Sequence, residues 1–435
     1  MPPTENDPAE RDTLTDIDAA IAGAIDAAID EGALLADLAG LIAEPSLGGR
    51  ETACQEKMAD LMGLAGLNVD LWELDFETLR RHPAYSAEVE RDRGLGVVGT
   101  WEGAGDGPSL ILNGHVDVVP IGDENQWTVP PFQATVTEDR VYGRGSCDMK
   151  GGLCCALAAI RALRKVGVRL RGRLILQSVI GEEDGGCGTL AAVQHGCAAD
   201  GAVIMEPTGL GIVAAQAGAM NFRLRIPGRA AHACVRDEGI SAIERFWPIH
   251  QALLEHEQEK NAAADHPLFA DQRPPWPLSI GTLKAGDWPS SVPDELVAEG
   301  RYGVSMDEGL GLARERFEAV VSEAAARDTW LREHPPTVEW WGGQFEPAET
   351  PADAPIVQTL QQAFKTVTGT DPVLTGVPYG ADMRLLIRQG GIPTVMFGPG
   401  DVRQAHAPDE FVPRADLLTV TQTLARGIVR FCGTV

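Results

Sequence analysis

The sequence predicts an α/β protein in which a mostly parallel sheet is covered by helices and a smaller α+β domain is inserted into the main one. Three observations support this fold class. In the first half of the chain, short apolar runs alternate with helix-like segments, the order of elements that builds parallel sheets. Near Gly218 the order changes to strand-helix-strand-strand-helix-strand, as in a ferredoxin-like unit. Pro335-Pro336 and a proline- and glutamate-rich stretch at 346–355 then mark the return to the main domain.

Length and charge limit the possible classes of function. A chain of 435 residues is long enough for two or three domains with a large core. Its formal charge of −27, with scattered basic residues, argues against binding of nucleic acid or of an anionic membrane surface. No apolar run approaches the roughly 18 residues that a membrane span requires, so we expect no membrane segment.

The N-terminus and the cysteines indicate a cytoplasmic protein. The chain begins Met1-Pro2-Pro3 and lacks the basic and apolar regions of a secretory signal. Residues 1–11 are polar, and we predict that they are disordered. The eight cysteines include no C-x-x-C pair, so we expect reduced, buried thiols rather than disulfides or zinc ligands.

The elements of the main domain follow from apolar periodicity. We predict helices over 12–43, 49–65, 152–163 and 189–195 in its first part. We predict strands over 69–74, 97–101, 110–112, 174–180 and 202–205. After the insertion we predict a helix over 356–367, a strand over 394–397 and a helix over 414–431. The main domain is therefore assigned to residues 12–217 and 335–435.

The inserted domain is assigned to residues 218–334. Residues 220–226 alternate like a half-exposed strand, with Arg223 and Arg225 on one face. Further strands are predicted over 278–283, 296–302 and 337–341, and helices over 238–259 and 307–327.

Acidic and histidine side chains follow several of the predicted strands. His115, Glu182, Glu183 and Glu206 each come where a strand ends, and in parallel sheets these ends form one edge where sites are built. Asp148, in a glycine-rich stretch, and His406, just past the strand at 394–397, complete the set of candidate metal ligands. Imidazoles and carboxylates without thiolates suit zinc or a neighbouring first-row ion at a hydrolytic site.

Two details of this set concern its chemistry. Asp117 lies two residues beyond His115, so in an extended segment both side chains point the same way, and we interpret Asp117 as the carboxylate that orients the imidazole. Glu182 and Glu183 are adjacent and should point apart. One of them can bind metal while the other acts as general base, and the spacing does not distinguish which.

The motifs together resemble the M20 family of metallopeptidases, which includes acetylornithine deacetylase, succinyl-diaminopimelate desuccinylase, aminoacylases and glutamate carboxypeptidases. The matching pieces are Gly114-His115-Val116-Asp117-Val118-Val119-Pro120, the stretch from Gly143 to Gly152, Glu182-Glu183 and Glu206-Pro207. The resemblance implies a zinc-peptidase-like catalytic domain that holds two Zn²⁺ ions, with Co²⁺ or Mn²⁺ as possible substitutes. It also implies a cis peptide bond between Asp148 and Met149.

The resemblance assigns roles to individual residues. It implies that His115, Asp148 and Glu206 bind one ion, and that Asp148, Glu183 and His406 bind the other. Glu182 becomes the general base. It further implies that the inserted domain is a lid and the contact surface of a homodimer, across which His232 reaches the partner's site to hydrogen-bond the oxyanion.

The sequence indicates the substrate less directly than it indicates the roles of the site residues. Arg301 and Arg384 are candidates to clamp a substrate carboxylate. Where desuccinylase-like members have an asparagine ahead of Val-Pro, this chain has Ser290-Ser291-Val292-Pro293. Our hypothesis is a two-zinc amidohydrolase that cleaves the amide of a small N-acyl amino acid or related N-acyl amine. The alternatives are a carboxypeptidase or dipeptidase, a formylaminopyrimidine deformylase, and an inactive binding protein of the same fold.

Overall fold

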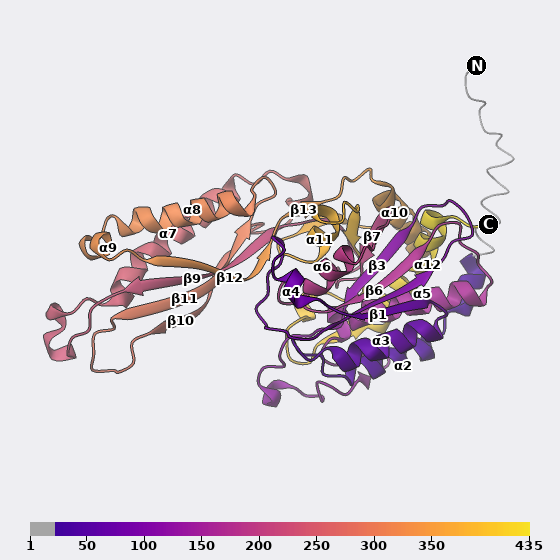
Figure 1. Cartoon of the computed structure of the whole chain (residues 1–435), viewed down its shortest axis with the longest axis horizontal. Helices are drawn as coiled ribbons and strands as arrows, with labels where there is room; N and C mark the ends of the chain where they lie inside the picture. The colour runs from indigo at the N-terminus through magenta and orange to yellow at the C-terminus, as the bar shows by residue number, and fades with distance from the viewer. Residues whose placement is uncertain (1–21) are drawn as a thin grey trace, which may run out of the picture.

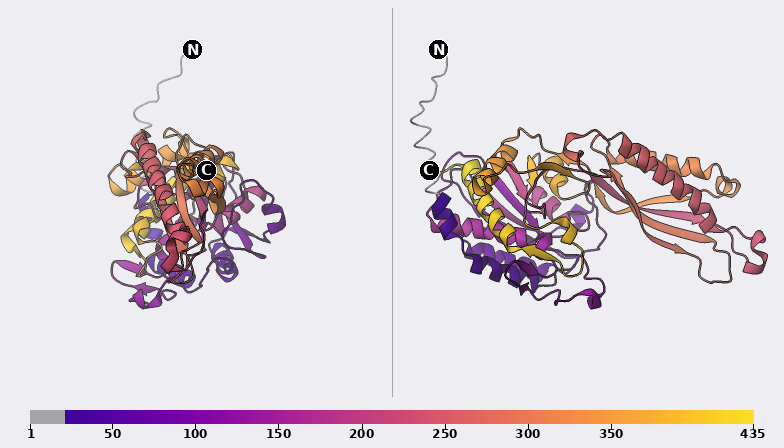
Figure 2. Two further views of the ribbon diagram at one scale, coloured as in Figure 1. Left: turned by 90° about the vertical axis from the view of Figure 1, so that its left-hand side faces the viewer. Right: turned by 180° about the vertical axis from the view of Figure 1, so that it is seen from behind.

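The computed structural model describes residues 22–435, which form two lobes (Figure 1). Each lobe has a large β-sheet of its own. The first lobe, residues 22–217 and 346–435, contains the longer sheet. The second lobe, residues 218–345, projects from it, and the two views of Figure 2 show that the molecule is elongated along the line joining the lobes.

The sheet of the first lobe has nine strands in the order β1-β2-β6-β3-β7-β15-β8-β13, with β14 paired to β8. Its strands are β1 (Asn68–Glu73), β2 (Leu95–Trp101), β3 (Leu110–His115), β6 (Leu174–Val179), β7 (Gly201–Ile204), β8 (Ile212–Gln216), β13 (Ala348–Glu349), β14 (Leu374–Val377) and β15 (Thr394–Met396). The central strands β6, β3, β7 and β15 pair in parallel. Strand β2 runs antiparallel to β1 and β6, and β8 runs antiparallel to β15 and β13 but parallel to β14. The carboxyl ends of the four central strands therefore meet at one edge.

Helices bury the apolar strands of this lobe. They are α2 (Glu31–Ile42), α3 (Thr52–Leu64), α4 (Phe76–Leu79), α5 (Gly151–Lys165), α6 (Cys187–Gln194), α10 (Pro355–Thr368), α11 (Met383–Arg388) and α12 (Arg414–Cys432). Helix α12 packs against both α5 and α10, and α6 packs against α11. Because β3 and β6 are buried along their whole length, their apolar residues form one continuous core with these helices.

Shorter elements complete the first lobe. A small sheet of β4 (Thr135–Val136), β5 (Arg140–Tyr142) and β16 (Phe411–Pro413) joins residues 135–142 to the segment that precedes α12. Single helical turns lie at η1 (Glu124–Gln126), η2 (Ser146–Lys150) and η5 (Val402–Gln404).

The second lobe confirms the predicted ferredoxin-like unit. Strands β9 (Gly218–Pro227), β10 (Leu278–Ala285), β11 (Glu295–Val304) and β12 (Thr337–Phe345) pair antiparallel in the order β10-β11-β9-β12. The lobe's helical elements are η3 (Ala233–Glu238), α7 (Ala242–Ala262), η4 (Pro267–Phe269), α8 (Leu310–Ala325) and α9 (Thr329–Glu333). Alternate residues of β9 point to a separate apolar core beneath α7 and α8. Arg223 on the other face pairs with Glu299 and Glu339.

Strand β12 bears on where the inserted domain ends. The sequence places that end at residue 334, yet β12 pairs with β9 and belongs to the sheet of the second lobe. We therefore propose a C-terminal boundary near residue 345 and keep Gly218 as the start. The predicted disorder of residues 1–11 concerns positions outside the described residues.

Two predicted helices are shorter than expected. The helix predicted over 12–43 is interrupted at 29 and 30, because the Asp30 carboxylate accepts a hydrogen bond from Ala33 N (3.0 Å) and starts α2 as an N-cap. Its part before residue 22 lies outside the described residues. The helix predicted over 238–259 begins only at Ala242, where Ser241 caps α7, and ends at Ala262; Glu238 is the last residue of η3 instead.

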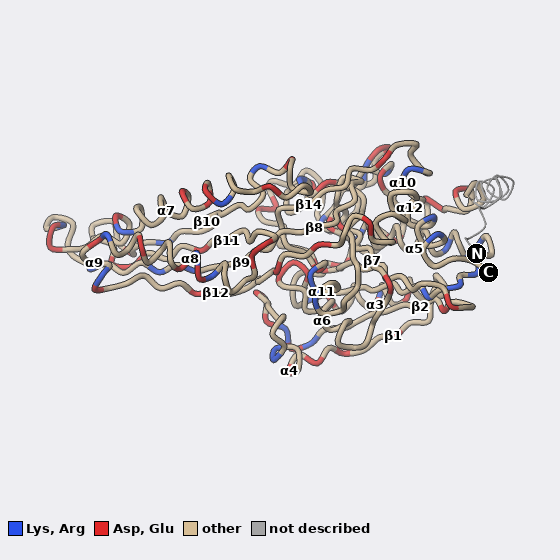
Figure 3. The backbone as a smooth tube through the Cα atoms, turned by 90° about the horizontal axis from the view of Figure 1, so that it is seen from above, with Lys and Arg blue, Asp and Glu red and all other residues tan. Residues whose placement is uncertain are grey.

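Charged residues are distributed over both lobes. Figure 3 shows acidic and basic positions interspersed along the backbone, in a chain whose formal charge is −27. Within residues 22–435, none of the helices combines the length and apolar character that crossing a bilayer would demand.

Candidate active site

A cluster of imidazole and carboxylate groups lies at the carboxyl edge of the central strands. His115 is the last residue of β3, Glu182 and Glu183 follow β6, and Glu206 follows β7. Asp148 belongs to η2, directly before α5, and His406 follows η5 after β15. The sheet therefore brings together residues that are nearly 300 positions apart in the chain, as the alternating pattern predicts.

Asp148 lies between the two imidazoles. Nε2 of His115 lies 3.2 Å from Oδ1 of Asp148 and 3.9 Å from Oε1 of Glu206. Nε2 of His406 lies 3.5 Å from Oδ2 of Asp148 and 3.0 Å from Oε2 of Glu183. One carboxylate thus turns an oxygen toward each histidine, which is the arrangement needed to bridge two cations.

The two adjacent glutamates have different neighbours. A carboxylate oxygen of Glu182 lies within 4.8 Å of donor atoms of His115 and Glu206. A carboxylate oxygen of Glu183 likewise lies within 4.8 Å of donor atoms of His115 and Asp148, and Glu183 also contacts His406. Glu182 therefore lies with Glu206 in one half of the cluster, and Glu183 lies with Asp148 and His406 in the other.

The cluster carries more negative charge than its own histidines balance. Burial raises the pKa of Glu182 well above its usual value, and the nearby Glu206 raises it further. Burial together with Asp148 raises the pKa of Glu183 to about 7. Hydrogen bonds with Asp148 and Glu183 raise the pKa of His406 to about 10. These raised pKa values mean that, without a cation, the cluster binds protons that offset part of the negative charge of its carboxylates.

The residues present fit divalent metal ions. Two imidazoles and several carboxylates, without a thiolate, are the donors found at catalytic zinc sites and at those of neighbouring first-row ions. Oε1 of Glu206 is buried and has no hydrogen-bond partner within residues 22–435, although a buried carboxylate oxygen rarely remains without a partner. A cation beside His115 would satisfy this oxygen.

Asp117 contacts both His115 and the loop of Glu183. Nδ1 of His115 lies 2.9 Å from the main-chain oxygen of Asp117 and 3.6 Å from its Oδ1. The carboxylate oxygen Oδ2 accepts a hydrogen bond from Glu183 N (3.1 Å). Asp117 therefore orients the imidazole mainly through its carbonyl group, while its side chain fixes the glutamate loop.

Glu410 is a residue of this site that the sequence analysis missed. Its Oε1 accepts hydrogen bonds from the main-chain nitrogens of Cys147 (2.9 Å) and Asp148 (3.1 Å). Its Oε2 pairs with the buried guanidinium of Arg144 at 2.6 Å. Glu410 thus holds the backbone on which Asp148 sits. In the sequence, its position four residues after His406 could have indicated that Glu410 lies near the site.

The peptide bond between Asp148 and Met149 is cis, as the resemblance implied.

Tyr379 is a second residue that the sequence did not single out. Burial raises the pKa of its hydroxyl well above the usual value, and the charges of Glu206 and Asp148 add to the shift. The tyrosine therefore lies near the carboxylates, on the loop between β14 and α11. Nothing in its local sequence pattern marks it, because it becomes a neighbour of the cluster only when that loop folds.

The three remaining candidates lie outside the cluster in the described chain. Arg384 is 2% exposed and donates hydrogen bonds to the main-chain oxygens of Ala381 (3.1 Å) and Gly185 (2.8 Å). Arg301, on β11, donates to Pro378 O (2.9 Å), next to Tyr379. His232 is exposed and accepts a hydrogen bond from Cys234 N through Nδ1 (3.1 Å).

His232 is far from the cluster of its own chain. It follows β9, which leaves the first lobe at Gly218 and ends at Pro227. Ten extended residues span about 30 Å. The imidazole therefore lies beyond the distal end of the second lobe's sheet.

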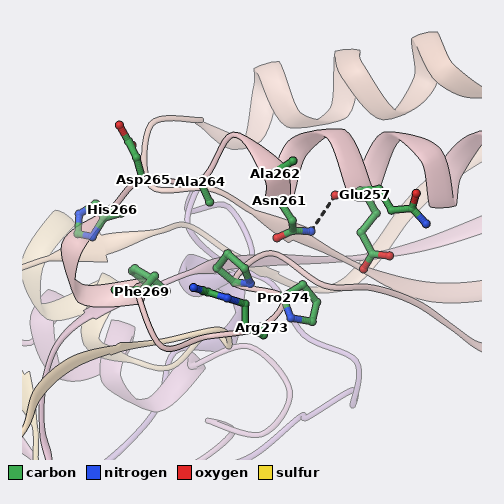
Figure 4. Close-up of a pocket in the computed structure, with 12 residues that line it drawn as sticks. Glu257, Asn261, Ala262, Ala264, Asp265, His266, Phe269, Arg273 and Pro274 are labelled. Atoms are coloured by element: carbon green, nitrogen blue, oxygen red, sulfur yellow. Dashed lines mark hydrogen bonds between the residues drawn. The ribbon is translucent and has the colours of Figure 1, made fainter.

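A roomy cavity lies away from the cluster, in the second lobe (Figure 4). It has a volume of about 780 Å³ and lies between the end of α7 and the segment that carries Phe269 and Arg273. Asn261 at its wall donates a hydrogen bond to the main-chain oxygen of Glu257 (2.8 Å). None of the residues of the cluster lines this cavity.

Comparisons with known proteins agree with this geometry. Residues 111–430 match the model of peptidase family M20/M25/M40. The chain is 30% identical over 416 residues to N-formyl-4-amino-5-aminomethyl-2-methylpyrimidine deformylase of Halalkalibacterium halodurans, covering 89% of this chain and 91% of that protein. It is 28% identical to acetylornithine deacetylase of Klebsiella pneumoniae, over 90% of this chain and 96% of that protein.

A solved structure extends the likeness to the fold. The M20 family metallo-carboxypeptidase Sso-CP2 of Sulfolobus solfataricus superimposes with a TM-score of 0.71 at 16% identity. The match covers 92% of this chain and 98% of that one. Both lobes therefore have counterparts in a protein of known structure.

Proposed function

The chain belongs to peptidase family M20/M25/M40, and from this premise we propose that it is a two-zinc amidohydrolase that cleaves the amide bond of a small N-acyl amine. The observation that carries the proposal is the position of Asp148 between His115 and His406, with a different glutamate in each half of the cluster. His115, Asp148 and Glu206 would hold one ion. Asp148, Glu183 and His406 would hold the other.

Each residue then contributes a defined part of the chemistry. When bound, the ions supply Lewis acidity toward a water molecule and the scissile carbonyl. Glu182, the glutamate left free of these two ligand sets, accepts a proton from the attacking water and returns it to the leaving nitrogen. Its pKa is raised by burial and by Glu206, which favours uptake of a proton by this carboxylate. Asp117 and Glu410 keep His115 and Asp148 in place.

We assign to His232 the stabilisation of the oxyanion in a partner subunit's site. The residue lies about 30 Å from the root of its own lobe, so it can reach a cluster only in another chain. Apolar side chains on the second lobe support a homodimer: Trp247 and Ile243 on α7 are 67% and 49% exposed, and Leu283 on the edge strand β10 is 50% exposed. The second lobe would thus serve as both lid and dimer contact.

The substrate we favour has a small acyl group. The similar proteins named above are a deformylase and an acetylornithine deacetylase, which by their names remove formyl and acetyl groups. A formylated aminopyrimidine is the second candidate, supported by 30% identity over most of the chain. Arg301 is the better placed of the two arginines for a substrate carboxylate, since it contacts the loop of Tyr379, whereas Arg384 already donates to two backbone carbonyls.

Activity on a panel of substrates tests the proposal. Purified protein loaded with Zn²⁺ should release amine from acetyl or formyl amides faster than from succinyl amides or dipeptides. A chelator should abolish the activity, and added Zn²⁺ should restore it, with two ions per chain. Faster cleavage of dipeptides would instead identify a peptidase. Two bound ions without turnover on any of these compounds would favour a binding protein.

We also propose a cytoplasmic location. All eight cysteines are free thiols, and six of them are buried. Unpaired thiols are the usual state in a reducing compartment.

A further inference from the structure

The loop that carries Glu182 and Glu183 is anchored through the residue that follows them. Asp184 is 6% exposed, and its Oδ2 accepts hydrogen bonds from Val89 N (2.8 Å) and from Nη1 of Arg91 (2.8 Å). Its main-chain oxygen accepts a further hydrogen bond from Glu88 N (3.2 Å). One short stretch, residues 86–91, therefore holds Asp184 at both its side chain and its backbone. We call this stretch the bridging segment.

The bridging segment is itself fixed to the first lobe. Arg91 is 3% exposed, and its Nη2 and Nε lie 2.7 and 2.9 Å from Oε1 of the buried Glu51, which precedes α3. Hydrogen bonds to Asp184 and the charges around it raise the pKa of Arg91, against the effect of its burial. The end of the segment near the cluster is thus a buried network that is costly to break.

The other end of the bridging segment contacts the second lobe. Oε1 of Glu88 accepts hydrogen bonds from the side-chain amide of Asn221, on β9, and from Gly343 N (3.3 Å), on β12. Oγ of Ser86 accepts a hydrogen bond from Gln344 N (3.2 Å), also on β12. Glu88 is exposed to solvent, so these contacts can form and break at low cost.

Two glycines allow the close packing at both ends. Gly185 has a φ of +140°, and a Cβ there would lie 2.0 Å from Ser86 O. Gly342 has a φ of +59°, and a Cβ there would lie 2.5 Å from Cγ of Glu88. Only glycine combines these backbone angles with so close an approach. The bridging segment is therefore fitted against the glutamate loop on one side and against the second lobe on the other.

We propose that the bridging segment couples the position of the second lobe to the placement of Glu182 and Glu183, with Glu88 and Asp184 as positioning residues. This inference rests on the proposed function for its effect on rate. When the second lobe holds Glu88 through Asn221 and Gly343, the segment holds Asp184, and the two glutamates keep their places against the cluster. When the lobe moves away, Glu88 is released and the glutamate loop loses one of its supports.

Substitutions at the contact between the lobes test the coupling. Glu88→Ala and Asn221→Ala should each lower kcat about tenfold with little change in KM, because misplacing a reacting group affects the chemical step more than substrate binding. The double variant should be no slower than Glu88→Ala, since that substitution already removes the contact with Asn221. Glu88→Gln keeps an acceptor oxygen for both donors and should retain most of the activity.

Glu90→Ala is the matched control. Glu90 is exposed and lies in the same segment, and its side chain makes no hydrogen bond or ion pair within residues 22–435. It should leave kcat unchanged. Equal rates for Glu88→Ala and Glu90→Ala, or additive losses in the double variant, would overturn the proposal.

Hydrogen exchange gives a readout that does not depend on activity. Asn221→Ala lies in the second lobe, yet deuterium uptake at residues 181–188 should rise in the metal-loaded variant, while Glu90→Ala should match the unmodified protein. Unchanged uptake in Asn221→Ala would refute the coupling even if the enzyme is active. A protein that hydrolyses no amide but shows the rise would refute the proposed function and retain the coupling.

Discussion

Glu182 and Glu183 are neighbours in the chain whose side chains belong to different halves of the cluster. The sequence predicted that they point apart, because adjacent residues in an extended segment do so. Spacing alone did not distinguish their roles, because both follow the same strand. The contacts of Glu183 with Asp148 and His406 separate them, since these contacts leave Glu182 beside His115 and Glu206.

Removing the carboxylate of Glu182 should separate metal binding from catalysis. Glu182→Gln should still bind two Zn²⁺ ions, because its ligand sets are intact, while kcat falls by about 10²–10⁴, the usual contribution of a general base. Metal analysis and steady-state kinetics on the same preparation measure both quantities. A near-normal kcat would remove Glu182 from the proton transfer.

Metal loading should release protons, and more of them at lower pH. In the metal-free protein, the pKa of His406 is raised to about 10 and that of Glu183 to about 7, so both carry protons at pH 6.5. A metal ion must displace these protons, and therefore the apparent affinity should increase as pH rises from 6.5 to 8.5. Titration calorimetry with Co²⁺ in buffers of different ionisation heat counts the protons. A heat that is the same in every buffer would contradict the expected release.

One physical reason explains why the sequence analysis missed Glu410 and Tyr379. Glu410, which holds the backbone of Asp148, and Tyr379 both lie on loops, and a loop residue becomes a neighbour of the cluster only through the path that the folded chain takes. His115, Glu183 and Glu206 were predictable because the end of a strand has a fixed place in a parallel sheet.

At the scale of elements, the main strands and helices were predictable and the short alanine- or glycine-containing strands were not. Strand β8 contains Ala214 and Ala215, and β14 contains Gly376, residue types that favour strands only weakly outside their tertiary context. The two strands pair with each other, and β8 also pairs with β15. The cap at Asp30 shows the converse, since one local hydrogen bond starts a new helix within a segment that apolar periodicity predicted as a single helix.

Helices α7 and α8 of the second lobe are joined by a buried ion network. Glu308 is 1% exposed, and its oxygens lie 2.6 Å from Nζ of Lys260 and 2.9 Å from Nη1 of Arg316. Burial raises the pKa of Glu308, but the hydrogen bond from Lys260 and the neighbouring positive charges outweigh it, so that the pKa is lowered overall. A carboxyl group with a lowered pKa contributes stability above its unfolded-state pKa, and this contribution is lost as pH falls through its folded-state value.

Glu308→Gln should therefore destabilise the second lobe in a pH-dependent way. At pH 7 the free energy of unfolding should fall by about 3 kcal/mol, because Lys260 is left buried without its partner. At acidic pH, where Glu308 is itself protonated, the difference from the unmodified protein should shrink. Urea unfolding at pH 7 and at pH 4 measures this, with Glu315→Gln, an exposed position on α8, as the control. An equal loss at both pH values would argue against the charge pairing.

At the scale of the whole molecule, the two-lobed arrangement separates His232 from the cluster of its own chain. If the second lobes form the proposed dimer contact, Trp247→Asp should weaken it and yield monomers with low activity and unchanged metal content. Size-exclusion chromatography and kinetics measure the two effects. Fully active monomers would show that no partner residue is needed.

Mixing two inactive variants tests directly whether His232 acts in the site of the partner subunit. Glu182→Ala and His232→Ala homodimers should both be inactive. After subunit exchange, a mixed dimer contains one site with Glu182 and a partner's His232, so some activity should return, up to about a quarter of normal in an equal mixture. Differently tagged subunits verify that mixed dimers have formed. No recovery in such dimers would place His232 outside the reaction.

The second lobe interrupts the sequence between Glu206 and His406, so the cluster is completed only by residues that are translated after that lobe. As the nascent polypeptide leaves the ribosome, it displays His115, Asp148 and both glutamates well before His406 exists. The second lobe, whose core is its own, has time to fold during this interval. The complete set of candidate metal ligands therefore exists only after His406 has been translated, which would limit how much metal a nascent chain without His406 could bind.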